Sequence, residues 1–549
     1  MIPSIFNPFV LHLLKLFLVT LLFAVFCVAC GGSGGGSTPA PQPNAPDWDL
    51  VVDTGSPGTS LNTALLGFYD LSGALYDYAN DPNLVTAMSS AGFAGPGGRG
   101  ADWRVGLGRW ELGTEIFPTL TDNTPCPNLL PENQSVHATD LALIASRDWF
   151  TYTDGTPVIA ADIDDARYGL DYIRSVIDTA AAFGANSYVS IDYMPRALSA
   201  NQTPNRTDCG ASFTNSVTNN QPQDSVVFAK AIAGLVQRVV EGTGSKTGFD
   251  RPRVADYWEV WNEPELPLFW EPTLAADPDL FFNMAILTLQ ELDNYRSTAI
   301  DPAAQSLKFG LASFLLADTA IGTLQGFDPA NIPMDFISFH DYSDDPLVIV
   351  DDIARVETAI QSSTNYKNIE LVLGEWGPDL LSRTADHAYA MSMEPALHAA
   401  TVIALGTYAG LDRAHNAIFY NYNSLIALGA LDNNVVPRPL YRAYELMGKL
   451  ISSNTESLTI QEAADGRMDA GLGAVLVSRD TVNGLVRALL INRNTASRTV
   501  QVTLDGTVAT PTVVYILDAS DDPVNPLRTL PMPNSTIQLP AQAVAVAEF

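Results

Sequence analysis

Basic residues are scarce in this chain of 549 residues, in which 29 Lys and Arg stand against 61 Asp and Glu, for a net charge of −32. A protein with this excess of negative charge repels nucleic-acid phosphates and anionic lipid head groups. The composition therefore argues against a nucleic-acid partner.

Histidine is also rare, with six residues, and the metal-binding pattern HExxH does not occur. These residues give no support for a zinc site, because zinc in proteins is held by clustered histidine, cysteine and carboxylate ligands. We expect no metal and no cofactor, so any catalysis has to use carboxylates.

One long apolar run, ending at Ala29, lies near the N-terminus and predicts a secretion signal over residues 1–30. The small residues before Cys30 and the Gly/Ser/Pro-rich stretch after it resemble a bacterial lipoprotein signal, which implies a lipid on Cys30 and a flexible linker over residues 31–50. We therefore expect an exported protein tethered to a membrane. A plain cleaved signal and an uncleaved anchor remain alternatives, since about 20 apolar residues can span a bilayer.

Cysteine is rare as well, with four residues in the whole chain. Once Cys27 is removed with the signal and Cys30 is assigned to lipid, Cys126 and Cys209 remain, both in loop-like stretches. Because exported proteins fold in an oxidising compartment, we expect these two residues to form a disulfide. Two unpaired thiols are the alternative.

Between about residues 60 and 450, short apolar runs alternate with amphipathic helical patterns, which is typical of a parallel α/β fold. Eight runs are candidate strands, and eight parallel strands close a (β/α)8 TIM barrel. A doubly wound open sheet is the alternative architecture. The candidate strands cover residues 65–71, 102–108, 187–193, 256–263, 308–314, 335–341, 369–375 and 416–422.

The pattern changes after residue 450. Short strand-like runs separated by Asn, Asp, Gly and Pro fill residues 451–549. This pattern predicts a C-terminal antiparallel β-sandwich as a second, smaller domain.

Two glutamates stand at the ends of predicted barrel strands. Glu263 in "WNEP" ends the fourth strand, where Pro264 cannot donate to a strand ladder, and Glu375 in "LVLGEWGP" ends the seventh. Barrels of this kind carry their chemistry at these strand ends, and two carboxylates across one pocket are what glycosidic bond cleavage needs. A structural salt bridge is the alternative for Glu263.

Tryptophans accompany both glutamates. Trp261, Trp270 and Trp376 have side chains that can stack on the faces of sugar rings. Ordinary core aromatics are the alternative for each of them.

The segment from about residue 60 to 450 resembles glycoside hydrolase family 39, within a clan of (β/α)8 retaining hydrolases. The resemblance rests on "LDYIRSVIDTAAAFGANSYVSIDYMPRALS", "YWEVWNEPELPLFW", "FISFHDYS", "ELVLGEWG" and "PRPLYRAYELM", which follow one another in the order expected for that family. It implies that Glu263 is the general acid/base and Glu375 the nucleophile. It also implies that Asn262 hydrogen-bonds the sugar hydroxyl next to the anomeric carbon.

The same resemblance places His340 and Tyr342 of "FHDY" where relatives orient the nucleophile or line the sugar subsite. A core position is the alternative for both. Arg104 could hold the nucleophile as a carboxylate, with Arg109 as its competitor for that role and a structural salt bridge as the alternative for either. Tyr420 and Tyr422 stand where relatives often have a tryptophan, so the resemblance does not define which side chain forms the floor of the sugar site.

The sequence thus predicts a retaining glycoside hydrolase acting on a poly- or oligosaccharide. A carbohydrate-binding lipoprotein without turnover and a transglycosylase that uses the same glutamates are the alternatives. Neither the sugar nor the choice between exo and endo action follows from the sequence.

Overall fold

The structure is a computed structural model, and its described residues all belong to one compact unit, residues 46–549. They are residues 46–56, 58–70, 86–87, 102–107, 177, 180, 185–192, 194, 200, 220–241, 256–267, 269–419, 427–432, 434–452, 454–530 and 534–549. The predicted signal, Cys30, Cys126, Cys209, Arg109 and Tyr420 lie outside them. None of the described helices combines the length and the apolar character that a membrane crossing requires.

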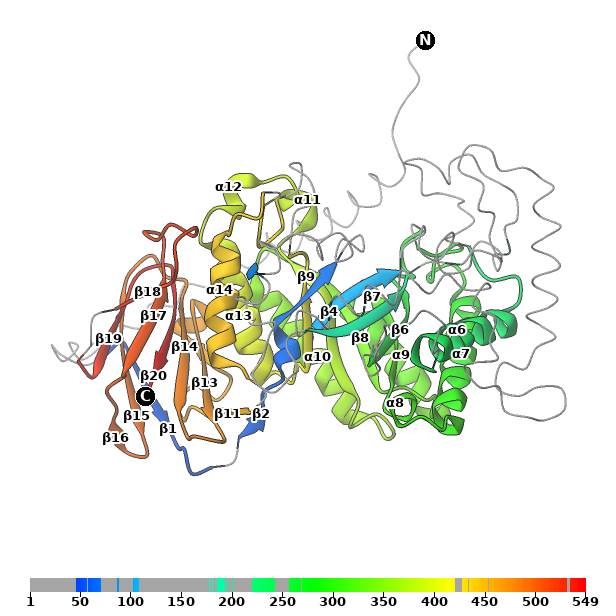
Figure 1. The fold of residues 1–549 in the computed structure, drawn as a ribbon, viewed down its shortest axis with the longest axis horizontal. Coiled ribbons are helices and arrows are strands. Elements are labelled where there is room, and N and C mark those ends of the chain that lie inside the picture. The colour runs from blue at the N-terminus through cyan, green and yellow to red at the C-terminus, as the bar shows by residue number, and fades with distance from the viewer. Residues whose placement is uncertain are drawn as a thin grey trace, which may run out of the picture. The chain divides into compact units, whose positions relative to one another are not determined.

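Eight parallel strands form a closed barrel (Figure 1). In barrel order they are β3 (Gly67–Asp70), β4 (Asp102–Leu107), β5 (Asn186–Ile191), β6 (Tyr257–Asn262), β7 (Lys308–Phe314), β8 (Phe336–Tyr342), β9 (Glu370–Gly377) and β10 (Arg413–Asn416). Strand β10 pairs with β3 and closes the ring. The predicted (β/α)8 barrel is confirmed, and the doubly wound alternative is excluded because an open sheet has two unpaired edges.

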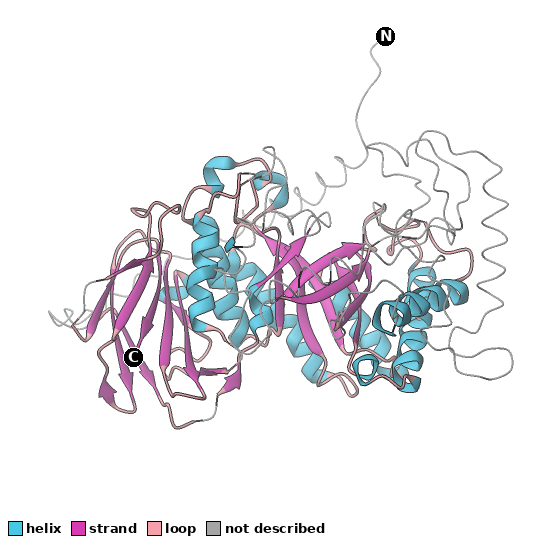
Figure 2. Ribbon diagram, viewed as in Figure 1, coloured by secondary structure: helices cyan, strands magenta, loops and turns pink. Residues whose placement is uncertain are grey.

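Helices surround the barrel, as the cyan ribbons of Figure 2 show. They are α6 (Ser225–Glu241), α7 (Pro278–Thr298), α8 (Pro302–Gln305), α9 (Ala317–Phe327), α10 (Pro346–Ser362), α11 (Leu380–Arg383), α12 (His387–Ala390), α13 (Glu394–Tyr408) and α14 (Pro439–Leu450). Helix α10 illustrates why they form. The side chain of Asp345 accepts from the backbone N–H of Leu347 and caps the first turn. Buried Ile349, Ile353, Val356 and Ile360 recur at helical spacing and face the core.

The eighth strand differs from its prediction. We expected it at residues 416–422, but β10 spans Arg413–Asn416 and ends where the predicted strand begins. The letters "RAHN" carry no apolar strand pattern, yet all four residues are buried, and Arg413 pairs inside the barrel with Asp102 and Glu370. A strand whose inward side chains are polar gives no hydrophobic signal, which explains the error.

Two further sheets combine strands that precede and strands that follow the barrel in the sequence. One contains β2 (Thr59–Ser60), β11 (Thr455–Leu458), β12 (Arg467–Met468), β13 (Gly473–Asp480), β14 (Val486–Asn492), β17 (Val513–Leu517), β18 (Arg528–Thr529) and β20 (Ala543–Glu548). The other contains β1 (Trp48–Val52), β15 (Arg498–Leu504), β16 (Thr507–Val508) and β19 (Thr536–Leu539). All pairings are antiparallel except that of β1 with β15, which Figure 1 shows side by side. Residues 48–50, which we expected in the linker, lie in β1.

Alternate residues of these strands serve two different cores. In β13, Val475 and Val477 pack with residues of the other sheet, whereas Leu476 belongs to the cluster that includes the barrel helices. Helices α13 and α14 accordingly lie between the barrel and this sheet (Figure 1). Two sheets that share a core are what the predicted sandwich requires.

A pair of glycines provides a test of barrel packing. A Cβ on Gly310 in β7 would lie 2.2 Å from ring carbons of Phe336, whereas a Cβ on Gly322 in α9 would meet nothing within 4 Å. We expect Gly310→Ala to lower the free energy of unfolding by about 1–3 kcal/mol through overpacking. Gly322→Ala should raise it by about 0.5–1 kcal/mol because alanine favours the helix. Denaturant unfolding of both variants measures these changes. An unchanged free energy of unfolding in Gly310→Ala would contradict the close packing of Gly310 against Phe336.

Candidate active site

The backbone at the end of β6 turns two consecutive polar side chains, those of Asn262 and Glu263, toward the barrel axis. Strict alternation would place Trp261 on the same side as Glu259, inside the barrel. Instead Trp261 has a φ of 82° and its ring packs outside, against Trp270 and Phe228. Glu263 also has a positive φ, 40°. Such conformations are costly for residues other than glycine, and they are found most often at functional sites.

The end of β9 is displaced in a similar way. The pairing of β8 with β9 shifts register between Phe339 and His340, so that His340 lies opposite Glu375. Gly374 stands at this irregularity, and a Cβ there would lie 2.5 Å from the hydroxyl oxygen of Ser313. A side chain at this position would therefore force the strands apart, which explains glycine directly before Glu375.

Glu263 contacts His340 across the barrel mouth. The Nδ1 atom of His340 lies 2.7 Å from Oε1 of Glu263, and both residues are buried. Burial raises the pKa of Glu263 from 4.5 to about 7, against the opposing charge of Arg104. Burial also lowers the pKa of His340 to about 4, although Glu375 opposes this shift. At neutral pH the pair is therefore a neutral imidazole beside a carboxyl that can hold or release a proton.

Glu375 is held from two sides. The NH1 group of Arg104 donates to its Oε1 atom over 2.8 Å, and the hydroxyl of Tyr342 donates to its Oε2 atom over 2.8 Å. Donors directed at both oxygens fix the orientation of this carboxyl group. Glu375 is therefore held in one orientation, close to a carboxyl that can be protonated.

Glu263, His340 and Glu375 converge closely, with one donor atom from each lying within 4.8 Å of the others. This is the donor set of a metal site, and in the part of the chain that the structure describes it is the one cluster with that geometry. The guanidinium of Arg104, 2.8 Å from Glu375, would repel a cation placed there. The cluster therefore fits proton transfer and nucleophilic attack better than metal binding.

Arg104 also fixes Asn262. Its NH2 group donates to Oδ1 of Asn262 over 3.0 Å and to the hydroxyl of Ser313 over 3.1 Å. This contact assigns the amide orientation of Asn262 and directs its Nδ2 group away from Arg104. An amide N–H beside Glu263 can then donate to a ligand hydroxyl.

Several residues of this site were not predicted from the sequence. Glu259, in the middle of β6, is completely buried and accepts from Nε and NH2 of Arg104 over 3.1 and 2.7 Å. Its signal was visible, since a glutamate inside the apolar run "YWEVW" needs a buried partner. Tyr69 places its ring 4.8 Å from the Arg104 guanidinium, and burial raises the pKa of nearby Asp192 to about 8.

The tryptophans do not line the site. Trp270 and Trp376 are fully buried, Trp270 against Trp261 and Phe281, and Trp376 stacked on His398. Neither ring face is open to a ligand, so these residues are the core aromatics of the stated alternative. Arg104, Asn262, His340 and Tyr342, by contrast, all meet the two glutamates or each other.

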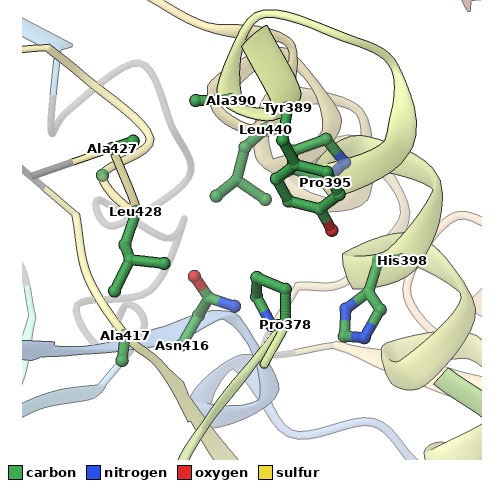
Figure 3. Close-up of a pocket in the computed structure, with 11 residues that line it drawn as sticks. Pro378, Tyr389, Ala390, Pro395, His398, Asn416, Ala417, Ala427, Leu428 and Leu440 are labelled. Carbon is green, nitrogen blue, oxygen red and sulfur yellow. The ribbon is translucent and has the colours of Figure 1, made fainter. Parts of the chain in front are cut away.

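A pocket adjoins the site on the side of β9 and β10 (Figure 3). It is open on one side, and Asn416 directs its buried, unpartnered Oδ1 atom into it. His398 donates its Nε2–H to the carbonyl of Ser343, which leaves Nδ1 as an acceptor. Ala417 and Leu428 line the pocket and also pack with Tyr342, the partner of Glu375. Acceptors between apolar walls suit a ligand group that carries a hydroxyl.

Comparison with known proteins supports the fold. No family model matches the sequence. The chain is similar in structure to a family 39 β-xylosidase from Caulobacter crescentus, at 16% identity and a TM-score of 0.59, over 91% of this chain and 99% of that one. It is also similar to a glucosidase from Croceicoccus marinus, at 17% identity and a TM-score of 0.58, over 92% and 99%. A family 51 α-L-arabinofuranosidase from Bifidobacterium longum matches at 14% identity and a TM-score of 0.56, over 92% and 100%. The chain therefore has the fold found in these glycosidases.

The raised pKa of Glu263 predicts a stability effect that does not depend on function. The unfolded chain releases this proton near pH 4.5, whereas the folded protein keeps it until about pH 7, so the folded state binds more protons in between. Stability contributed by this group is therefore lost as the pH rises through that range. We expect Glu263→Gln to be more stable than wild type at pH 8, by up to about 3 kcal/mol, with little difference at pH 4.

Chemical denaturation at both pH values measures this difference. Glu394→Gln, at an exposed position in the first turn of α13, is the matched control and should show no comparable pH dependence. An equal effect of Glu263→Gln at both pH values would contradict the assignment.

Proposed function

We propose that this protein is a retaining glycoside hydrolase, related to family 39, that cleaves poly- or oligosaccharides with Glu263 and Glu375. The observation that carries the proposal is the convergence of these two glutamates: one carboxyl oxygen from each and a ring nitrogen of His340 lie within 4.8 Å of one another. Retaining enzymes hold their two carboxyl groups about 5–5.5 Å apart, whereas inverting enzymes leave about 6.5–9.5 Å for a water molecule. The similarity in fold to known glycosidases supports the same assignment.

In this mechanism Glu263 is the acid. With a pKa of about 7 it is about half protonated in neutral solution, and the protonated form gives this proton to the leaving oxygen as the glycosidic bond breaks. Glu375 attacks the anomeric carbon and forms a glycosyl ester. Glu263, now ionised, then takes a proton from a water molecule, which attacks the ester and releases the sugar.

The neighbouring residues support these steps. Tyr342 and Arg104 hold the two oxygens of Glu375, and His340 holds Glu263 without adding a charge. The free N–H of Asn262 would donate to the hydroxyl next to the anomeric carbon, a contact that strengthens as positive charge develops on the sugar. The intact set of partners around both glutamates argues against a binding protein that has lost turnover.

Variants of the two glutamates test the mechanism. Glu375→Ala removes the nucleophile and should abolish nearly all turnover, whereas Glu263→Ala should impair poor leaving groups far more than activated aryl glycosides, which need little protonation. Added azide should give a glycosyl azide of inverted configuration with Glu375→Ala and of retained configuration with Glu263→Ala. Time-resolved NMR of the first product of the wild type, over a panel of glycosides, is the decisive measurement. An inverted product would refute the mechanism even if both glutamates were essential.

We further propose that the protein is exported and tethered through a lipid on Cys30. The support is the sequence around this cysteine and the linker that leads toward β1. Cys30→Ser should release the protein from membranes, because the lipid would no longer be attached. Membrane fractionation with mass spectrometry of the N-terminus measures this. A membrane-bound variant that keeps residues 1–29 would mean a protein anchor instead of a lipid.

A further inference from the structure

Arg104 serves two carboxylates at once. Its NH1 group reaches Glu375, while Nε and NH2 both point at one oxygen of Glu259. Arg104 and Glu259 are both completely buried, whereas Glu375 lies at the mouth. The guanidinium therefore links the candidate nucleophile to a carboxylate one layer deeper in the barrel.

Glu259 is bound so completely that it stays ionised. Besides Arg104, its other oxygen accepts from the hydroxyls of Tyr188, over 2.9 Å, and Ser338. Burial alone would raise the pKa of Glu259, but the charge of Arg104 and the hydrogen bond from Ser338 hold it at about 2. At neutral pH, Glu259 therefore carries a full negative charge.

We propose that Glu259 is a positioning residue for the reaction: it fixes the Arg104 fork so that a single N–H group reaches Glu375, and it offsets the guanidinium charge beneath the nucleophile. This inference rests on the proposed glycosidase function. Without Glu259, the fork would be free to bind Glu375 through two N–H groups, the arrangement that guanidinium and carboxylate prefer. The guanidinium would then compete with Tyr342 for the second oxygen of the nucleophile, and the uncompensated positive charge would oppose the developing charge on the sugar.

The charge also acts on Glu263. Arg104 lowers the pKa of Glu263, so an uncompensated guanidinium would lower it further. The described titratable groups that surround Arg104 and the two candidate catalytic glutamates come from seven barrel strands and the turns that follow them. Strand β7 contributes the hydroxyl of Ser313. They are Tyr69, Arg104, Tyr188, Asp192, Glu259, Glu263, His340, Tyr342, Glu375 and His415. Of these, Glu259 is the carboxylate that contacts the largest number of Arg104 nitrogens.

The barrel contains a matched control for this test. At its other end, Glu370 contacts Arg413 over 2.7 Å and the hydroxyl of Tyr257 over 2.8 Å, repeating the contacts that Glu259 makes with Arg104 and Tyr188. The two tyrosines even stack on each other, with ring centroids 5.7 Å apart. Equivalent substitutions in the two layers therefore make the same chemical change at different distances from Glu375.

The experiment compares Glu259→Gln with Glu370→Gln. Glu259→Gln should lower kcat about a hundredfold with little change in KM. Activity falls at high pH as Glu263 loses its proton, and this alkaline limb of the pH profile should move to lower pH by about half a unit to one unit. Glu370→Gln should leave kcat and the limb unchanged, whatever it does to thermal stability. Glu259→Asp keeps the charge on a shorter side chain, so it should restore the limb without restoring kcat.

Equal losses of kcat in Glu259→Gln and Glu370→Gln, or an unmoved limb in Glu259→Gln, would overturn the proposal. If Glu259→Gln does not fold, Tyr188→Phe and Tyr257→Phe replace the pair. Tyr188→Phe should lower kcat several-fold more than Tyr257→Phe, and equal values would reject the inference.

A measurement that needs no turnover separates the proposed role of Glu259 from the proposed glycosidase function. If the wild type hydrolysed no glycoside, the proposed function would fail. Carbon-13 NMR titration of the Glu263 carboxyl would still decide the role of Glu259. The pKa of Glu263 should fall in Glu259→Gln and stay unchanged in Glu370→Gln. The same pKa in both variants would refute the proposal that Glu259 offsets the charge of Arg104.

Discussion

A single buried guanidinium organises the mouth of this barrel. Arg104 comes from β4, yet it contacts side chains at the ends of β6, β7 and β9. Burying a guanidinium is costly unless each of its donors meets an acceptor, and here carboxylates, an amide and a hydroxyl supply them. The positions of Glu375 and Asn262 follow from this requirement, because both are acceptors that Arg104 needs for its own satisfaction.

The interior of the barrel carries a second charged layer. Near the start of the strands, Arg413 pairs with Asp102 and Glu370 and lies 3.7 Å from the ring centroid of Tyr257. Aromatic rings, among them Tyr188 and Phe336, fill the space between the layers. Barrels of this class commonly fill their interior with branched apolar side chains. Here ion pairs connect strands that are distant in sequence.

These charged layers explain which features the sequence revealed. Glu263 and Glu375 were predictable because each ends an apolar strand, and Pro264 marks one of those ends. Strand β10 was not, since its inward residues are the polar Arg413 and His415, and the ion-pair partners of Arg413 lie on other strands. The orientation of Trp261 also escaped prediction, because it depends on a positive φ that no local pattern encodes. Arg104 contacts Glu375, whereas Arg109, its competitor for that role, lies outside the described residues.

The pairing of β1 with β15 changes how the chain divides. Trp48 lies beside Val500, and Leu50 beside Val502, so the first described strand completes a sheet whose other members come from the end of the sequence. The barrel is in effect an insertion within a two-sheet unit, entered after β2 and left before β11. A chain cut at residue 450 would leave Trp48, Leu50 and Val52 without their core. During synthesis the partners of these residues are made last, and pairings between segments so far apart in sequence form slowly.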